Sequence, residues 1–291
     1  MPKIILHDGI NQITKISIIC MFKNNEKYLN EFFFKIVNDF EEMYDVDFEY
    51  YVIENNSTDN TRSLLRDFFK KQSTKSKLLL FNSKTEVYTG GDGKQYERIK
   101  NISNIRNKLV NFIVPLSSNW SLFIDSNIFF KKEILSDMFN YNPCRNNIGM
   151  MTPYTQQLLI PQIHSNIPNI TKPTLLGHYY DTFSIYDTNN KNFWPLCPFE
   201  KCKLCRHNDC KNRERIKENV NVVDVNSAFG GFALIKTDIL NNKSIRWDTL
   251  SHNIQNDESI CEHFLFCFLL KNITNQRIVL LQDIDYVYRT Y

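Results

Sequence analysis

Three polar residues, Asp125, Ser126 and Asn127, directly follow the apolar run "WSLFI". A carboxylate at the end of a buried strand can bind a hard cation such as Mn²⁺ or Mg²⁺, and a nearby amide oxygen can assist directly or through water. A cation held there would neutralise the diphosphate of a nucleotide. The same residue types are also favoured helix caps, so "DSN" is either a metal site or the cap of a helix over "IFFKKEIL".

A second polar cluster, "ENNSTDNT", begins at the end of the apolar run "FEYYVI". Its members Glu54, Asn56 and Asp59 offer oxygen and amide groups that can hydrogen-bond a ribose or a base edge. The alternative is a polar turn that caps the following helix. Two such clusters, each at the end of an apolar run, favour a nucleotide site more strongly than either cluster alone.

Two arginines, Arg98 and Arg106, lie eight positions apart in a helical pattern, which places them on nearly the same helix face. Such charges are commonly solvated, but this helix directly precedes the Asp125 strand. Arg106 or Asn107 is therefore well placed to contact a nucleotide. The motifs G-x-x-x-x-G-K-[ST] and G-x-G-x-x-G are absent, which argues against a P-loop or a dinucleotide turn.

These residues need a scaffold, and the first half of the chain alternates between strand and helix patterns. This alternation predicts an α/β fold with a mostly parallel sheet flanked by helices. Ligands of such sheets bind outside the carboxyl ends of the strands, where "KNNE", "NNSTDNT" and "DSN" occur. No second domain or internal repeat is visible, so residues 1–291 are expected to form one domain. The predicted strands are 16–22, 48–55, 77–81 and 120–124, and the predicted helices are 26–44, 56–71 and 96–114.

Composition supports a globular chain. The 291 residues are 42% hydrophobic, enough to fill the core of one large domain. The net charge of +3 gives no reason to expect a nucleic-acid partner. No apolar run approaches the roughly 20 residues that cross a bilayer, and the amino terminus lacks a signal-peptide pattern. We expect a cytoplasmic protein without a transmembrane segment.

Four of the eight cysteines crowd into residues 197–210 with the spacing C-x4-C-x2-C-x4-C. The central C-x2-C is typical of a structural zinc site, and four thiolates complete a tetrahedron. Two disulfides are the next interpretation and free thiols the last. The cysteine-rich insertion comprises Cys197, Cys202, Cys205 and Cys210, whereas Cys20, Cys144, Cys261 and Cys267 are expected to be small buried hydrophobic residues.

Six segments, taken in order, resemble the GT-A class of nucleotide-sugar-dependent glycosyltransferases. More narrowly, they resemble the fungal capsule-associated, Cap59-type mannosyltransferases and related enzymes of large DNA viruses. The resemblance runs from about Lys15 to the end and implies a nucleotide-binding half at about 15–153 and an acceptor-side half at about 154–291. The segments are "ISIICMFKNNEKYLNEFF", "YYVIENNSTDNTRSLL", "ISNIRNKLV", "WSLFIDSNIFFKKEIL", "SAFGGFALIKTDIL" and "CEHFLFCFLL".

The resemblance also assigns roles on the donor side. Asp125-Ser126-Asn127 takes the position of the D-x-D metal motif, with asparagine in place of the second acid. The region of Glu54 and Asp59 resembles the ribose contact of the family. Arg106-Asn107 resembles its "RN" signature beside the nucleotide.

On the acceptor side, Gly230 and Gly231 resemble a segment in which small residues let a sugar approach the backbone. Glu262 matches the acidic residue that acts as base in inverting members, and Asp257 and Glu258 lie near the same predicted helix start. In a retaining enzyme, Glu262 would instead position the acceptor or stabilise the cationic sugar. His263 is either a further metal ligand or a packed core histidine.

Together these features predict a metal-assisted transferase that moves a sugar from a UDP- or GDP-sugar to a glycan or other hydroxyl acceptor. One alternative is a protein that keeps the fold and binds sugar or nucleotide without turnover. A second alternative, a nucleotidyltransferase, is disfavoured because the first predicted strand is not followed by a Gly-rich loop bearing Lys or Arg.

Overall fold

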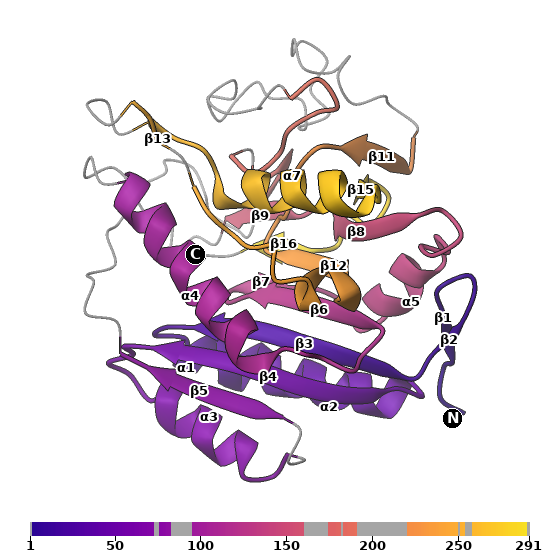
Figure 1. Ribbon diagram of the computed structural model, residues 1–291. Helices are drawn as coiled ribbons and strands as arrows, with labels where there is room; N and C mark the ends of the chain where they lie inside the picture. Colours follow the sequence, from indigo (N-terminus) through magenta and orange to yellow (C-terminus); the bar gives the residue numbers. More distant parts are fainter. Residues whose placement is uncertain are drawn as a thin grey trace.

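A large eight-stranded sheet forms the centre of the molecule (Figure 1). The computed structural model describes residues 2–72, 76–82, 95–159, 174–181, 183–190, 220–249, 251–253 and 258–289. Six of the eight strands run in the same direction, and β11 and β12 run opposite to them. The predicted mostly parallel sheet is therefore confirmed. In spatial order its strands are β11 (Val222–Val225), β15 (Arg277–Leu281), β8 (Ile148–Pro153), β12 (Phe232–Lys236), β6 (Trp120–Asp125), β3 (Lys15–Phe22), β4 (Asp47–Asn55) and β5 (Lys77–Phe81).

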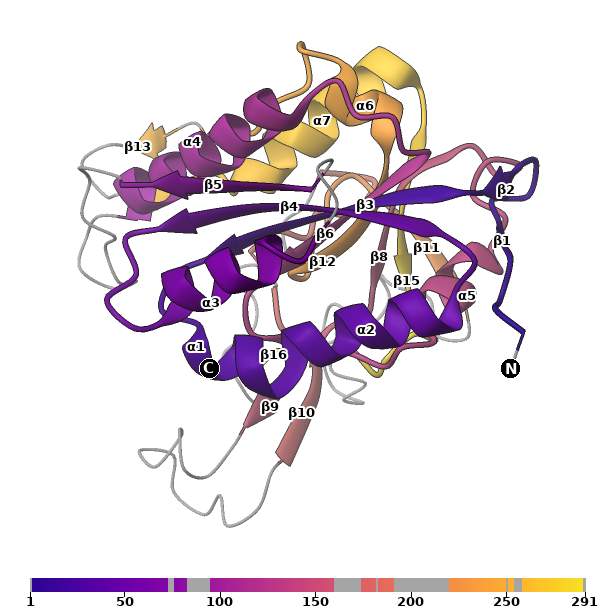
Figure 2. The same cartoon turned by 90° about the horizontal axis from the view of Figure 1, so that it is seen from below.

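Helices cover both faces of this sheet (Figure 2). One face carries α1 (Glu26–Tyr28), the π-helical η1 (Leu29–Phe33), α2 (Phe34–Met43), α3 (Thr61–Phe69) and α5 (Ile134–Phe139). The other face carries α4 (Gln95–Ile113), α6 (Thr237–Asn241) and α7 (Glu262–Thr274). Because side chains alternate along a strand, β3 sends Ile18 and Cys20 into the first core and Ile19 into the second.

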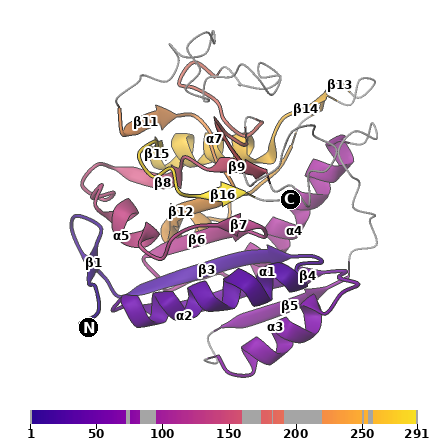
Figure 3. The same ribbon diagram turned by 180° about the vertical axis from the view of Figure 1, so that it is seen from behind.

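The apolar faces of the helices explain how the helices pack on the sheet. In α2, Ile36, Val37 and Phe40 share one apolar face, and the Phe40 ring stacks on Phe48 of β4 with centroids 5.7 Å apart. Figure 3 shows α2 lying along β3 and β4. On the opposite layer, α4 buries an equivalent face that includes Leu109. The helices predicted at 26–44 and 96–114 therefore form close to their expected bounds.

A smaller four-stranded sheet lies beside the end of β6. Its order is β10 (Thr174–Tyr179), β9 (Gln156–Leu159), β16 (Tyr288–Arg289) and β7 (Ile128–Phe129). Because β7 begins directly after Asn127, the alternative interpretation in which "DSN" caps a helix over "IFFKKEIL" is wrong. The next helix, α5, begins at Ile134 and has Glu133 at its N-cap. Two further pairs of short strands are β1 (Leu6–His7) with β2 (Gln12–Ile13) and β13 (Ser251–Asn253) with β14 (Glu258–Ser259).

Both halves of the chain contribute to the large sheet, because β11, β12 and β15 all come from the second half. The chain therefore forms one domain. Within the ranges that the structure describes, none of the helices has the length and apolar character that crossing a membrane requires.

Three of the four described cysteines are buried as predicted, and Cys144 departs from the prediction. Cys20, Cys261 and Cys267 are free and buried, and Cys144 is free and half-buried with its thiol 3.1 Å from Oδ2 of Asp8. The cysteine-rich segment, with Cys197, Cys202, Cys205 and Cys210, lies outside the described residues. Its zinc and disulfide interpretations stay predictions.

Candidate active site

Asp125 is the last residue of β6, in the middle of the large sheet between β3 and β12. Its backbone N–H donates to the carbonyl of Gly231 at 2.8 Å, and its side chain remains 31% exposed. Asn127 then turns the chain into β7 with a φ of 74°, a left-handed conformation that asparagine tolerates better than most residues. Asp125, Ser126 and Asn127 are all half-buried, so the Asp125 carboxylate is accessible at the carboxyl end of its strand.

A buried arginine joins this carboxylate to a second one. Nη2 of Arg106, on α4, donates to Oδ1 of Asp125 at 3.2 Å, and Nη1 donates to Oε1 of Glu262 at the start of α7. The guanidinium also lies over the Phe229 ring, 5.0 Å from its centroid. Burial lowers the pKa of Arg106, but the two carboxylates raise it further, so the net shift is upward. Arg106 therefore stays charged and fixes the positions of both acids.

His263 lies in the core beside this pair. Its Nδ1 accepts a hydrogen bond from Nε1 of Trp247 at 3.2 Å, which places the ring proton on Nε2, 3.4 Å from Oε1 of Glu262. The ring stacks on Phe229 with centroids 3.8 Å apart. With both nitrogens directed at core partners, the imidazole has the environment of a packed histidine rather than that of a metal ligand.

We expect the stability of the protein to fall as the pH drops below about 6.5. Burial, and then repulsion by Arg106, lower the pKa of His263 well below 6.5, so the unfolded chain binds the proton more tightly than the folded one. The free energy of unfolding that neutral His263 contributes is fully present above pH 6.5. Below that pH it is lost, at up to about 1.4 kcal/mol per pH unit. Urea unfolding at several pH values measures this slope.

His263→Gln is the test variant and His7→Gln, at an exposed position, the matched control. His263→Gln should reduce the slope of unfolding free energy against pH by the equivalent of about one bound proton, whereas His7→Gln should leave the slope unchanged. Equal slopes for His263→Gln and the wild type would show that another group causes the acid sensitivity.

The polar cluster after β4 is tied into the fold. Glu54 is fully buried, and its carboxylate accepts hydrogen bonds from Nε of Arg62 and from the backbone N–H of Ser57, at 2.7 Å for the latter. Asp59 accepts the backbone N–H groups of Thr61 at 3.0 Å and Glu26 at 3.1 Å. Burial raises the pKa of Asp59, but a hydrogen bond with the Thr61 side chain and these backbone hydrogen bonds outweigh it and lower the pKa overall.

The loops after β3 and β4 are also bonded to each other. Asn24 accepts the Thr58 backbone N–H at 2.8 Å, and the Asn25 backbone N–H donates to Oγ1 of Thr61 at 2.7 Å. Asn24 and Asn56 both have left-handed backbones, with φ of 52° and 55°. The two predicted clusters "KNNE" and "NNSTDNT" thus form one ordered rim at the carboxyl ends of β3 and β4.

The "RN" pair has divided roles in the structure. Asn107 holds the backbone of Trp247: its Nδ2 donates to the carbonyl at 2.6 Å and its Oδ1 accepts the N–H at 3.0 Å. Its side chain therefore anchors the segment before α7, while Arg106 alone reaches Asp125. Arg98 is half-buried on the same helix, two turns earlier.

The two glycines behind Asp125 are required by their conformation and by close packing. Gly230 and Gly231 have φ of 62° and 69°. A Cβ on Gly231 would lie 2.6 Å from Cδ1 of Ile128 and 3.0 Å from Oη of Tyr180, and one on Gly230 would lie 2.7 Å from Oη of Tyr179. The space beside both glycines is thus occupied by protein side chains.

Gly231→Ala is expected to lower the free energy of unfolding by about 2 kcal/mol or more, because it combines a strained φ with overpacking. The midpoint of urea unfolding measures the loss. Ser126→Ala, at a half-buried position nearby, is the control and should stay within about 0.5 kcal/mol of the wild type. A Gly231→Ala midpoint equal to that of the wild type would contradict the close packing.

Sequence reasoning missed three further residues, Tyr180, Asp181 and Arg289: the first two interact electrostatically with both Asp125 and Arg289. The guanidinium of Arg289 lies over the Tyr180 ring, 4.7 Å from its centroid. Burial raises the pKa of Asp181, and the charges of Glu262 and Asp125 raise it further, while Ser184 and Arg289 act in the opposite direction. "HYYDTF" and "YVYRTY" are the only signals, each a charged residue flanked by aromatic residues in a segment of weak periodicity.

The structure describes little of the two other predicted acids, Asp257 and Glu258. Asp257 lies outside the described residues, and of Glu258 only the backbone, in β14, is described. In the part of the chain that the structure describes, no three His, Cys, Asp or Glu side chains gather in a metal-binding cluster. Asp125 and Asn127 suit a hard cation that takes its remaining ligands from substrate phosphates and water.

Comparison with solved structures agrees with this architecture. The crystal structure of S. aureus TarS matches with a TM-score of 0.50 and 17% identity, over 96% of this chain and 37% of that one. The Pyrobaculum calidifontis mannosyltransferase PcManGT, solved with GDP-Man and Mn²⁺, matches with a TM-score of 0.47 and 10% identity, over 99% and 60%. The chain thus spans less than two thirds of either relative. The likeness to TarS shows the fold, which is the predicted GT-A fold.

No curated protein sequence matches the chain. The family model described as cryptococcal mannosyltransferase 1 matches residues 15–268, which include the Asp125 strand, the Arg106 helix and the start of α7. The match covers most of the chain and agrees with the predicted resemblance. The chain belongs to the family of cryptococcal mannosyltransferase 1.

Proposed function

We propose that the protein transfers a sugar from a nucleoside-diphosphate sugar to a hydroxyl group of a glycan or similar acceptor. The observation that carries this proposal is the buried bridge from Asp125 through Arg106 to Glu262, which brings one strand end and two helices together. Support comes from the family and from the structural relatives, because PcManGT was solved with GDP-Man and Mn²⁺ and TarS with UDP-GlcNAc.

On the donor side, Asp125 and Asn127 would hold Mn²⁺ or Mg²⁺ together with the diphosphate. The cation would neutralise the negative charge that develops on the leaving nucleoside diphosphate. Arg106 keeps the Asp125 carboxylate oriented through its hydrogen bond to Oδ1. The rim that Glu54 and Asp59 order after β3 and β4 is our candidate for the nucleoside contact, with Asn56 at its surface.

On the acceptor side, Glu262 is already engaged by Arg106 and His263, so its role in this proposal is to position Arg106. Asp181 is a better candidate for taking the proton of the acceptor hydroxyl in an inverting reaction, because burial and neighbouring carboxylates raise its pKa. NMR analysis of the anomeric configuration of the product would decide whether a base is needed.

A screen of UDP-, GDP- and dTDP-sugars, with and without Mn²⁺, tests the function. At 100 times its Kd, the correct donor should stabilise the protein by about 2.7 kcal/mol, which raises Tm by roughly 5 °C or more. Slow release of free sugar, measured by chromatography, should accompany this shift. Absence of any shift with all three nucleotides would contradict a donor site.

A binding protein without turnover is the second candidate, favoured by the asparagine at position 127 in place of an acid. It predicts the same thermal shift without hydrolysis of the donor. The two readouts of the screen therefore separate the two functions.

A further inference from the structure

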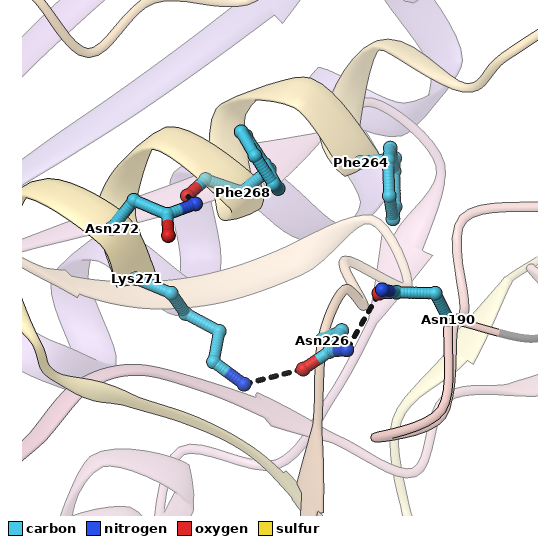
Figure 4. Close-up of a pocket in the computed structure, with 6 residues that line it drawn as sticks. All are labelled: Asn190, Asn226, Phe264, Phe268, Lys271 and Asn272. Carbon is cyan, nitrogen blue, oxygen red and sulfur yellow. Dashed lines mark hydrogen bonds between the residues drawn. The ribbon is translucent and has the colours of Figure 1, made fainter.

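A cavity lies between α7 and the two asparagines Asn190 and Asn226 (Figure 4). Its volume is about 180 Å³. Four of its residues follow one another on α7 at the helical spacing i, i+4, i+7 and i+8, whereas Glu262, Phe266 and Leu270 point into the core. The cavity is thus distinct from the Asp125 site. It is lined by Phe264, Phe268, Lys271 and Asn272 of α7 and by Asn190 and Asn226.

Asn226 organises the polar wall of this cavity. Its Nδ2 donates to Oδ1 of Asn190 at 2.6 Å and to the carbonyl of Thr188 at 3.2 Å, and its Oδ1 accepts a hydrogen bond from Nζ of Lys271. Asn272 donates to the carbonyl of Phe268 at 2.8 Å. Within the described residues, the side-chain N–H groups of Asn190, the side-chain amide oxygen of Asn272 and the other Lys271 protons have no protein partner, so this wall offers both donors and acceptors.

Aromatic rings form the apolar wall. The Phe264 ring packs against Tyr186 with centroids 4.3 Å apart, which holds it in place. Phe268 is 49% exposed, and its ring is 6.4 Å from that of Phe264. Both rings line the cavity together with the Lys271 and Asn226 side chains (Figure 4). The cavity therefore combines an aromatic wall with a wall of amide groups.

The residues that line the cavity indicate which class of ligand it can bind. No carboxylate lines it, which disfavours a metal ion, and a single lysine is a weak site for a diphosphate. Its volume is below the 300 Å³ or so of pockets for drug-sized ligands, so it suits one small ring. A hexose presents an apolar C–H face to an aromatic ring and hydroxyl groups to amides, and so matches both walls.

We propose that this cavity binds one hexose unit of a glycan, at a subsite separate from the transfer site. Between Glu262 and Lys271, α7 rises by about 13 Å, so a glycan of a few units could extend from one site to the other around the start of the helix. In the proposed function, the subsite would hold a distant sugar of a polymeric acceptor. The binding inference itself rests on the cavity alone and does not require turnover.

Saturation-transfer NMR of the full chain with methyl α-D-mannopyranoside, methyl β-D-glucopyranoside, methyl β-D-galactopyranoside and mannotriose tests this proposal. At least one probe should bind with a Kd of about 1 mM or tighter. Phe268→Ala should weaken that binding by about tenfold, through loss of the aromatic contact, and Lys271→Ala should weaken it as well. Both positions lie at the cavity surface, so a circular dichroism spectrum should confirm that the variants fold.

Two controls locate the binding. Ile273→Ala alters a side chain on α7 that is 45% exposed and outside the cavity, and it should leave binding unchanged. Asp125→Ala should also leave it unchanged, because the transfer site lies elsewhere. No binding of any probe, equal binding by Phe268→Ala, or loss of binding in Asp125→Ala would each overturn the proposal. Failure of donor hydrolysis, by contrast, would bear only on the proposed transferase function.

Discussion

Asp125→Ala is expected to lower sugar transfer, or donor hydrolysis, by at least about a hundredfold and to abolish the effect of Mn²⁺ on donor binding. The carboxylate is the accessible acid at the centre of the site, and no neighbouring carboxylate in "DSN" can replace it. Folding should persist, because Glu262 still pairs with Arg106 in the variant. The measurement is kcat/KM with the donor found by the screen, titrated with Mn²⁺.

Ser126→Ala is the matched control for that experiment, since it changes the adjacent residue without removing a charge. It should keep activity within a fewfold of the wild type. If Asp125→Ala stayed active and still responded to Mn²⁺, the cation would have to bind elsewhere, and the site assigned to "DSN" would be wrong.

Arg106→Met should cause the largest loss of stability among single changes in the site. It leaves the buried Glu262 carboxylate without its guanidinium partner, which typically costs about 3–5 kcal/mol. For a chain of this size, Tm should fall by roughly 10 °C. Donor affinity should fall as well, because Asp125 loses its orienting contact. Arg98→Met, on the same helix and half-buried, is the control and should be nearly neutral.

A double variant identifies the cause of this loss. Arg106→Met combined with Glu262→Met replaces the buried ion pair by apolar groups, which is often neutral or stabilising. It should recover most of the lost stability without restoring donor affinity. If the double variant were as unstable as the sum of both single variants, the damage would come from packing rather than from the unpaired charge.

The sequence predicted the scaffold well for a physical reason. The nearly continuous apolar runs "ISIICMF" and "FEYYVIEN" and the helical spacing in the segments between them are local signals, and both survive in the structure. The two-residue strands β7 and β16 have no such signal, because they form by pairing Tyr288 with Phe129. Their absence from the prediction explains the wrong helix after Asn127 and the failure to notice Arg289.

Individual site residues were easier to predict than their contacts. Asp125, Arg106 and Glu262 were all expected at the site, but the bridge joins residues 156 positions apart, which no local pattern encodes. Glu54 and Asn107 were expected to face a nucleotide. In the structure the side chains of both are bonded within the fold, since a polar residue near a ligand site can serve the loop that shapes it.

The position of β12 in the large sheet has a consequence for synthesis on the ribosome. β6, which ends at Asp125, can pair with β3 early, but its other neighbour, β12, follows about 110 residues later. At typical translation rates, one edge of β6 stays open for roughly 5–20 s. An open apolar edge invites pairing with other chains, so nascent protein should benefit from chaperones or slow growth at low temperature. The proposed site includes Glu262 of α7, so nascent chains that end before α7 lack the ion pair between Arg106 and Glu262.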